Sequence, residues 1–268
     1  MRASVLFALL LLTQASMFLG QVNAQYPVPA PTRTLSVLKS GLEFQSDDVK
    51  KLQADDFANP GALWTARGEA LWTTPAGIAQ KSCASCHRAA ATAMKGVAAR
   101  YPAFDKSQSR VLDLEARVNS CRVKHQGAAA FAAESDELLG MTAFVAQQSR
   151  GMPIAVAIDG DAGAAFEAGR KLYYQRIGQL NLACNQCHEQ NWHRRLLTQP
   201  ITQGHGNGYP AYRLDWQKMG SLQRRLRACF YGVRAELPAF GADELIALEL
   251  FLAWRGEGLT IETPAVRR

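Results

Sequence analysis

The sequence has no polybasic tract, few cysteines and, after its first 24 residues, no long hydrophobic run. Without a basic stripe, nucleic acid is not an expected partner, although the formal charge of +7 favours an anionic substrate or partner. Six cysteines in 268 residues are too few for a disulfide scaffold. No later segment approaches the roughly 18 apolar residues that a membrane span needs. With 48% hydrophobic and 20% charged residues, the chain is neither globally disordered nor collagen-like.

The first 24 residues have the features of a secretory signal peptide. Arg2 supplies the positive start, Val5–Leu12 is an unbroken apolar run, and Val22-Asn23-Ala24 is a small-x-small cleavage site. A membrane anchor is the alternative, but the apolar run is too short to cross a bilayer. We therefore predict cleavage after Ala24 and export from the cytoplasm. Residues 25–50, which begin with a proline-rich stretch, are predicted to form an extended N-terminal arm.

The rest of the chain contains an internal repeat. Cys83-Ala84-Ser85-Cys86-His87 recurs as Cys184-Asn185-Gln186-Cys187-His188. Tyr101-Pro102-Ala103-Phe104 recurs, at a slightly longer spacing, as Tyr209-Pro210-Ala211-Tyr212. At that same longer spacing, Leu114, Arg117 and Cys121 recur as Leu222, Arg225 and Cys229. This self-similarity predicts two similar domains, residues 51–152 and 153–268.

The pattern of apolar residues is mostly helical. Ser135–Arg150 begins with residues suited to a helix N-terminus and ends at Gly151, and Asp243–Arg255 repeats its one-sided apolar pattern. Alternating runs typical of strands are scarce. We therefore predict an all-α fold.

Each Cys-x-x-Cys-His segment is the attachment signature of a c-type haem, in which two thiols bond to the haem vinyl groups and the histidine reaches the iron. A thioredoxin-type redox pair and half of a zinc site are the alternatives. Two copies that both end in histidine, in an exported chain, favour haem. We therefore predict two covalent haems c, one on Cys83 and Cys86 with His87, the other on Cys184 and Cys187 with His188. The fold prediction becomes two tandem cytochrome c-like domains related by internal duplication.

Cys121 and Cys229 remain after haem attachment, at equivalent places in the two repeats. Two interpretations are open: each thiolate ligates the iron of its own repeat, or the two cysteines form a disulfide between domains. Matching repeat positions favour ligation. Methionine is the usual alternative ligand, but Met141, which alone has a clear repeat partner, corresponds to Leu248 and is expected to pack in the core. His125, His193 and His205 have no counterparts, and the last two fall in an extra loop of the second repeat.

The chain resembles the SoxA family, the dihaem subunits of the SoxAX cytochromes of bacterial sulfur oxidation. Both haem motifs carry the resemblance, together with the segments Leu114-Glu115-Ala116-Arg117, Arg224-Arg225-Leu226-Arg227-Ala228-Cys229 and Pro264-Ala265-Val266-Arg267-Arg268. The resemblance implies His/Cys coordination at both irons, by His87 with Cys121 and by His188 with Cys229. It also implies a periplasmic protein that forms a heterodimer with a SoxX cytochrome subunit.

The second repeat carries the predicted active site. Arg224, Arg225 and Arg227 surround Cys229 in the sequence, with Arg194 and Arg195 in the same domain, and cationic neighbours stabilise a thiolate and attract a small dianion. Arg117 precedes Cys121 at the same interval, so a shared structural role, such as pairing with a haem propionate, is the alternative for Arg225. The resemblance implies that Cys229 is the active residue, carried as a persulfide, and that Arg225 contacts substrate.

The reaction implied by the resemblance is that of L-cysteine S-thiosulfotransferase. Thiosulfate is coupled oxidatively to a cysteine of the carrier protein SoxYZ, and two electrons pass through haem to SoxX and a small cytochrome c. A dihaem electron carrier without sulfur-transfer activity is the competing hypothesis.

Overall fold

The computed structural model describes residues 29–30 and 35–268, and the predicted signal peptide lies outside these residues. The helices are α1 (Asp47–Ala54), α2 (Ala62–Thr73), α3 (Cys83–His87), α4 (Ala90–Ala93), α5 (Leu114–Cys121), α6 (Asp136–Gln147), α7 (Gly163–Tyr174), α8 (Cys184–His188), α9 (Leu222–Gly232) and α10 (Asp243–Arg255). Short 3-10 turns occupy Gly41–Phe44, Ala98–Arg100 and Gly160–Ala162, and a π-helical turn, Arg122–Gln126, follows α5.

Three small sheets accompany the helices, so the all-α prediction is wrong in this detail. Strands β1 (Ala103–Asp105) and β2 (Arg110–Leu112) form one antiparallel hairpin, and β3 (Arg195–Leu196) and β4 (Gln199–Pro200) form another. The third sheet has the order β6-β5-β7, in which β5 (Ala211–Arg213) pairs antiparallel with β6 (Lys218–Gly220) and parallel with β7 (Ala265–Arg267). Such short strands cannot show an alternating pattern in the sequence.

Two helix pairs form the framework: α2 packs along α6, and α7 packs along α10. A glycine permits the close approach in each pair. A Cβ at Gly68 would lie 2.1 Å from the carbonyl oxygen of Gly140, and a Cβ at Gly169 would lie 1.9 Å from that of Ala247. No side chain fits at either distance, so both crossings require glycine.

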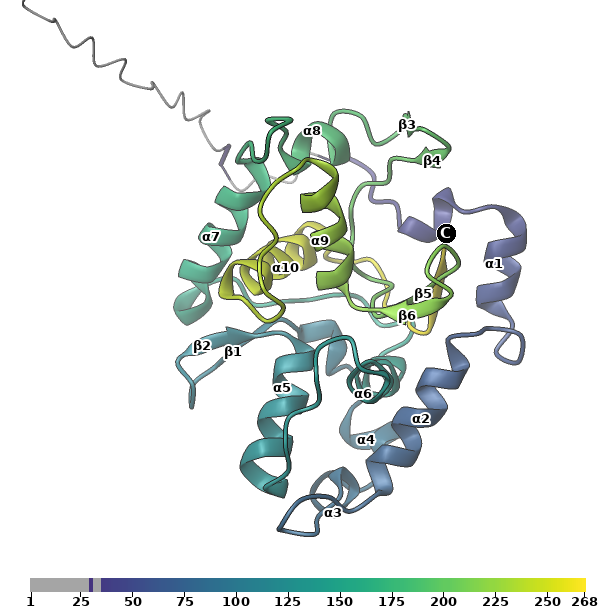
Figure 1. Cartoon of the computed structure of the whole chain (residues 1–268), viewed down its shortest axis with the longest axis vertical. Coiled ribbons are helices and arrows are strands. Elements are labelled where there is room, and N and C mark those ends of the chain that lie inside the picture. Colours follow the sequence, from purple (N-terminus) through teal and green to yellow (C-terminus); the bar gives the residue numbers. More distant parts are fainter. Residues whose placement is uncertain (1–28, 31–34) are drawn as a thin grey trace, which may run out of the picture.

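Equivalent elements occur at the spacings that the repeat predicts. The spacing of the two Cys-x-x-Cys-His motifs relates α2 to α7 and α3 to α8. The longer spacing of the two Tyr-Pro segments relates the β1–β2 hairpin to β5–β6 and the start of α5 to that of α9. The two sets occupy different ends of the molecule, with α2, α3 and α5 at one end and α7, α8 and α9 at the other (Figure 1). The two halves of the chain share a hydrophobic core, in which Ala99 and Val111 from the first half are clustered with Leu245 and Phe251 of α10 from the second half.

The segment before α2 is attached to the C-terminal end of the chain. Gln53 of α1 accepts hydrogen bonds from the backbone N–H of Val266, at 3.0 Å, and from the side chain of Arg267. The arm predicted for residues 25–50 is therefore not extended throughout. Gly41–Phe44 is a 3-10 turn whose N-cap, Ser40, forms a capping box with Glu43, and α1 begins at Asp47.

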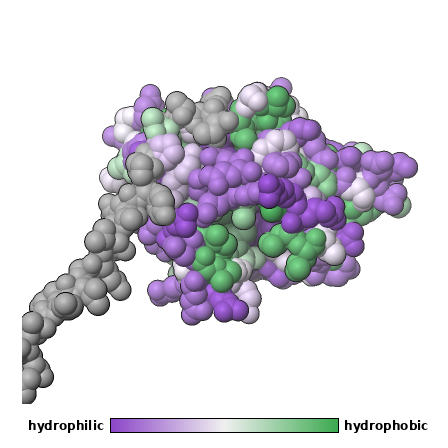
Figure 2. Space-filling view, turned by 90° about the horizontal axis from the view of Figure 1, so that it is seen from above, coloured by the Kyte–Doolittle hydropathy of each residue, from purple (hydrophilic) through white to green (hydrophobic). Residues whose placement is uncertain are grey.

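The surface at the α8 end is mostly hydrophilic, and its hydrophobic side chains lie in separate groups rather than in one continuous area (Figure 2). Among the described residues, no helix combines the length and apolar character needed to cross a bilayer.

Candidate active site

The histidine of the second motif is held in one orientation by the loop that follows it. His188 ends α8, and its Nδ1 lies 2.7 Å from the carbonyl oxygen of Thr202. A carbonyl can only accept, so Nδ1 carries the proton and donates, which leaves Nε2 free to act as a ligand. Gly204 brings the loop this close: its φ is +78°, and a Cβ there would lie 2.9 Å from Cγ of His188. Burial lowers the pKa of His188 to about 4, so the imidazole is neutral, as metal ligation requires.

A cavity of about 270 Å³ brings the predicted residues of the second repeat together. His188 enters from α8, whereas Arg225 and Cys229 enter from α9, one helical turn apart. Helix α9 begins directly after Ser221, its N-cap, which accepts a hydrogen bond from the N–H of Arg224 at 3.0 Å. This cap fixes the start of the helix that carries Arg225 and Cys229. The cavity is also lined by His205, Tyr209, Arg213, Trp216, Leu222, Leu226, Arg267 and Arg268.

The electrostatics of the site place Cys229 close to both motif cysteines and to Arg225. Burial, and after it the nearby Cys229 sulfur, raise the pKa of Cys184 to about 12. The same two causes raise the pKa of Cys187. Interaction with the nearby Cys229 sulfur is the main cause that raises the pKa of Arg225, whose guanidinium therefore stays protonated. The arrangement is a thiol facing a permanent cation inside a partly enclosed cavity.

Of the arginines predicted around Cys229, the structure places only Arg225 on the cavity wall. Arg224 stacks on Trp216 with its guanidinium carbon 4.2 Å from the ring centre, and Arg227 stacks on Phe240 at 4.5 Å. Arg194 and Arg195 lie at the exposed β3–β4 hairpin and do not line the cavity.

Three cavity arginines were not identified from the sequence as site residues: Arg213, Arg267 and Arg268. Arg267 and Arg268 belong to the segment Pro264–Arg268, which carries part of the family resemblance. That resemblance was the signal in the sequence that could have identified them. Arg267 is neutralised by an ion pair with Glu262. Arg213 lies 3.9 Å from Asp215, which also lines the cavity, and it donates to the Tyr209 hydroxyl at 3.3 Å and to the carbonyl oxygen of Arg268, so its charge is partly offset.

Arg225 differs from Arg117, its counterpart in the first repeat. Arg117 forms an ion pair with Asp105. Among the residues that the structure describes, no carboxylate lies within ion-pair distance of Arg225. The position equivalent to Asp105 in the second repeat, at the spacing of the Tyr-Pro segments, is occupied by Arg213. The second site therefore presents Arg225 without an ion-pair partner, beside the cation of Arg213, where the first presents a neutralised pair, and this favours the binding of an anion.

The predicted residues of the first repeat are arranged more openly. His87 ends α3, is exposed, and has its ring centre 5.8 Å from that of Trp72. Cys121 ends α5 and lies close enough to Cys83 that, after burial, it is the next cause that raises the pKa of Cys83. Trp72 is fixed by a hydrogen bond of 2.9 Å to the carbonyl oxygen of Arg88.

All six cysteines lie among the described residues and all are free, so the structure contains no Cys121–Cys229 disulfide. Instead, Cys121 acts electrostatically on Cys83, and Cys229 acts on Cys184 and Cys187. Each spare cysteine therefore lies beside the motif of its own repeat.

The remaining candidates divide into cavity, surface and core residues. His205 is buried, lines the cavity, and has Nε2 at 3.1 Å from Oε1 of Gln203, whereas His193 and His125 are exposed. Met141 packs with Trp72 and Phe144, as expected for a core residue.

The donor set of the second site fits a c-type haem. His188 offers an unoccupied Nε2, and Cys229 offers a sulfur to the same cavity. Cys184 and Cys187 stand on the same short helix as His188, one turn apart, as attachment to two vinyl groups requires.

Comparisons with known proteins agree with this arrangement. A family model described as SoxA/TsdA, cytochrome c domain, matches residues 67–154 and implies covalently bound haem c. The L-cysteine S-thiosulfotransferase subunit SoxA of Pseudaminobacter salicylatoxidans is 42% identical over 230 residues, 85% of this chain and 80% of that protein. That of Rhodovulum sulfidophilum is 38% identical over 251 residues, 92% of this chain and 88% of that protein. The crystal structure of SoxXA from P. pantotrophus superposes with a TM-score of 0.84 at 36% identity, covering 88% of this chain and 89% of that chain. The fold is therefore of the cytochrome c type, and the chain belongs to the SoxA family.

Proposed function

We propose that this protein is the catalytic subunit of an L-cysteine S-thiosulfotransferase, which couples thiosulfate oxidatively to a cysteine of the carrier protein SoxYZ. One observation carries the proposal: Cys229 and Arg225, which has no carboxylate partner among the described residues, share a cavity with the oriented imidazole of His188. The names of the relatives support the same activity.

The proposed cofactors are two covalent haems c, held in two tandem cytochrome c-like domains that arose by duplication. Cys83 and Cys86 would attach the first haem, with His87 and Cys121 as axial ligands. Cys184 and Cys187 would attach the second, with His188 and Cys229 as axial ligands. The elements that recur at the two repeat spacings support both the duplication and the second attachment site. When bound, haem accepts electrons from the reaction and passes them on.

Arg225 is proposed to bind the sulfonate end of thiosulfate. Its planar guanidinium offers two parallel donors to a pair of sulfonate oxygens, and Arg213 on β5 supplies a second positive charge on the same wall. Because Cys229 lies one turn from Arg225, a sulfonate held at Arg225 leaves the terminal sulfur of thiosulfate directed toward the Cys229 sulfur.

The proposed chemistry balances in two steps. The Cys229 sulfur would form a sulfur–sulfur bond with the terminal sulfur of thiosulfate, an oxidation that gives up two electrons, for which bound haem would supply the acceptor. A thiolate of the carrier then attacks that terminal sulfur, forms carrier–S–S–sulfonate and releases the Cys229 thiolate. The carrier thiol loses its proton to solvent. In the persulfide form of the enzyme, the outer sulfur on Cys229 takes the place of the cysteine sulfur.

The assembly is proposed to follow the solved relative. Because the solved relative is a SoxXA structure, it supports a SoxX subunit as the partner, which would receive the electrons and pass them to a small cytochrome c. The signal peptide predicted at residues 1–24 would place this assembly in the periplasm.

The competing function is that of a dihaem electron carrier. It gives Cys229 and Arg225 no role in a reaction with thiosulfate, so variants of these two residues distinguish the two functions. In the complex with its SoxX partner, Cys229→Ser should abolish thiosulfate-dependent cytochrome c reduction while both haems remain attached. Arg225→Gln should reduce the rate, and its matched control, Arg117→Gln in the first repeat, should leave it nearly unchanged. Mass spectrometry of the peptide that contains Cys229 should show added sulfur after exposure to thiosulfate. Full turnover by Cys229→Ser would reject the enzyme in favour of the electron carrier.

A further inference from the structure

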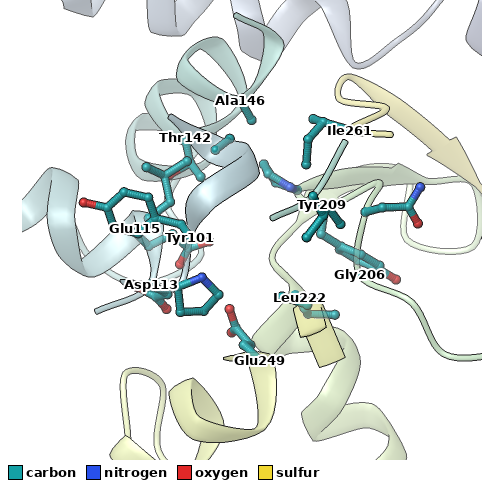
Figure 3. Close-up of a pocket in the computed structure, with 17 residues that line it drawn as sticks. Tyr101, Asp113, Glu115, Thr142, Ala146, Gly206, Tyr209, Leu222, Glu249 and Ile261 are labelled. Carbon is teal, nitrogen blue, oxygen red and sulfur yellow. The ribbon is translucent and has the colours of Figure 1, made fainter. Parts of the chain in front are cut away.

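A second cavity, of about 100 Å³, lies between the two halves of the molecule. In Figure 3, Tyr101, Glu115 and Thr142 of the first half line one side, and Tyr209 and Ile261 of the second half lie opposite. The walls include residues that correspond across the repeat: Tyr101 with Tyr209, Pro102 with Pro210, Leu114 with Leu222, Thr142 with Glu249 and Ala146 with Ala253. The cavity therefore lies where the two repeats face each other.

Three carboxyl groups line this cavity: Asp113, Glu115 and Glu249. Asp113 is buried and accepts hydrogen bonds of 2.6 Å from the N–H of Ala116 and from Nε2 of Gln223. Burial raises the pKa of Glu115 and Glu249 well above the usual glutamate value, and the neighbouring carboxyl groups raise both further. Three carboxylates in one small cavity repel one another, so the group retains at least one proton at a pH where an exposed glutamate has lost it.

Two further polar atoms in the cavity wall have no partner among the residues that the structure describes. The Thr142 hydroxyl belongs to a side chain that is only 3% exposed, and neither it nor Oδ1 of Asn207 makes a hydrogen bond there. A hydroxyl donor and an amide acceptor, unpaired beside carboxyl groups, provide the contacts that hydrogen-bonded water needs. The cavity is therefore suited to hold water that shares protons with the carboxyl groups.

Among the described residues that line the cavity, none is a lysine, arginine or histidine that could neutralise these groups. The cations near it act from outside: burial raises the pKa of Asp113, and Arg110, which offsets a part of that rise, is itself paired with Asp243 at 2.7 Å, while Arg224 lies 3.6 Å from Glu134. Glu134 adds a further negative charge that acts on Glu115. The other titratable groups in the wall are the phenols of Tyr101 and Tyr209. Protonation, rather than ion pairing, is thus the means by which this cluster loses charge.

The acidic cavity adjoins both candidate haem sites. Tyr209 and Leu222 line it and also line the cavity of His188 and Cys229. On the other side, Tyr101 lies close enough to Cys121 for that thiol to influence its pKa. The electric field of a charge change at either site therefore reaches the carboxyl groups through protein. Protein screens such an interaction much less than water does.

We propose that the cavity formed by Asp113, Glu115, Glu249, Thr142 and Asn207 is a proton-binding site coupled to electron transfer. The inference rests on the proposed haem sites. One carboxylate of the cluster would take up one proton from solvent, and become a carboxylic acid, for each electron that a bound haem gained. When that electron left for the next acceptor, the carboxylic acid would release its proton to solvent. The site compensates each added negative charge inside the protein, and so eases the acceptance of electrons from thiosulfate.

The sign of the effect follows from charge. At acidic pH the cluster is protonated and neutral, which favours the reduced haem. As pH rises through the range in which the cluster titrates, it becomes negative and disfavours reduction, so the midpoint potential falls with rising pH. Above that range the potential is again independent of this cluster.

The test is a redox titration of the complete haem-bearing complex with its SoxX partner, followed by visible absorption at a series of pH values. The wild type should show potentials that fall with pH. The double variant Glu115→Gln/Glu249→Gln should show a flattened dependence, and Glu244→Gln, on the exposed side of α10, should match the wild type. Infrared difference spectra on reduction should gain a carboxylic acid carbonyl band that the double variant lacks.

The outcomes separate this inference from the proposed function. An unchanged pH dependence and an unchanged infrared band in a double variant with both haems attached would overturn the proton site alone. Normal pH dependence without thiosulfate turnover would overturn the proposed enzyme and leave the proton site standing. Failure of haem to attach to the wild type would overturn both. If the double variant does not fold, Thr142→Val keeps the test open, because loss of a hydroxyl that can hold water beside the carboxylates should shift the titration to higher pH.

Discussion

The two repeats of this molecule share a backbone plan and differ in the charges beside their spare cysteines. In the first repeat, Arg117 pairs with Asp105 on β1. In the second, Arg225 has no such partner within the described part of the chain, and the position of Asp105 is taken by Arg213 on β5. A framework that orients an arginine one turn from a cysteine is thus present twice, but in only one copy is that arginine paired with a carboxylate. The comparison indicates that the placement of a carboxylate, rather than the helix that carries the cysteine, distinguishes the two sites, and it underlies the proposal that the second site binds an anion.

The shared plan itself can be tested through the two glycines at the helix crossings. Gly169→Ala and Gly68→Ala should each destabilise the protein by about 3 kcal/mol or more, because each new Cβ would meet a backbone carbonyl that cannot move aside. Denaturant unfolding of the holoprotein measures the effect, and Gly232→Ala, where a Cβ meets nothing within 4 Å, is the control. A small effect at one crossing only would show that the two repeats do not depend on the same packing.

The difference in charge between the two sites can be removed by replacing Arg213 in the second repeat with aspartate, the residue at the equivalent position, Asp105, in the first repeat. Arg213→Asp should lower kcat/KM for thiosulfate about 100-fold, since one guanidinium is lost and Arg225 gains a partner, and a charge-assisted hydrogen bond contributes about 1.5–3 kcal/mol. Steady-state kinetics on the complex measures this. The corresponding change in the first repeat, Asp105→Asn, should have little effect. Equal losses from both variants would contradict the assignment of the second repeat as the thiosulfate site.

The carboxyl groups between the repeats should make stability depend on pH. The raised pKa of Glu249 means that the folded protein holds more protons than the unfolded chain above the normal glutamate pKa, so wild-type stability falls as pH rises through that range. Glu249→Gln removes this loss and should unfold at higher denaturant concentration than wild type, with a difference that grows from acidic to alkaline pH. Denaturation curves at several pH values measure it. A difference that is constant with pH would mean that Glu249 does not titrate there.

The smallest effect is expected at an exposed ion pair of the first helix pair. Arg67 of α2 pairs with Glu137 of α6, whereas the position of Arg67 in the second repeat is Ala168. Glu137→Gln should cost less than about 1 kcal/mol, because exposed pairs are screened by solvent. The same denaturant measurement applies. A loss comparable to that of Gly68→Ala would show that this pair, and not the glycine contact, holds α2 to α6.

Much of the framework was accessible from the sequence because it rests on local or periodic signals. The apolar pattern of Ser135–Arg150 and Asp243–Arg255 predicted helices that the structure places at Asp136–Gln147 and Asp243–Arg255. The motif segments predicted where His188 lies in the chain, but not the loop carbonyl of Thr202 that fixes its ring. The local hairpins were missed because strands of two or three residues show no alternating pattern, and β7 was missed because it forms only when the C-terminal segment reaches β5, a contact between residues distant in sequence.

By itself, the sequence determined the repeat, the two Cys-x-x-Cys-His motifs and the family, because each of these depends on residues at fixed short spacings. Which arginines face the cavity was decided by tertiary structure: Arg224 and Arg227 stack on aromatic rings, while Arg213, Arg267 and Arg268 reach the cavity from distant strands. The acidic cavity between the repeats was likewise invisible in the sequence. Asp113, Glu115 and Glu249 lie on elements that meet only when the two halves pack, and a carboxyl group acquires an unusual pKa only in the environment that such packing creates.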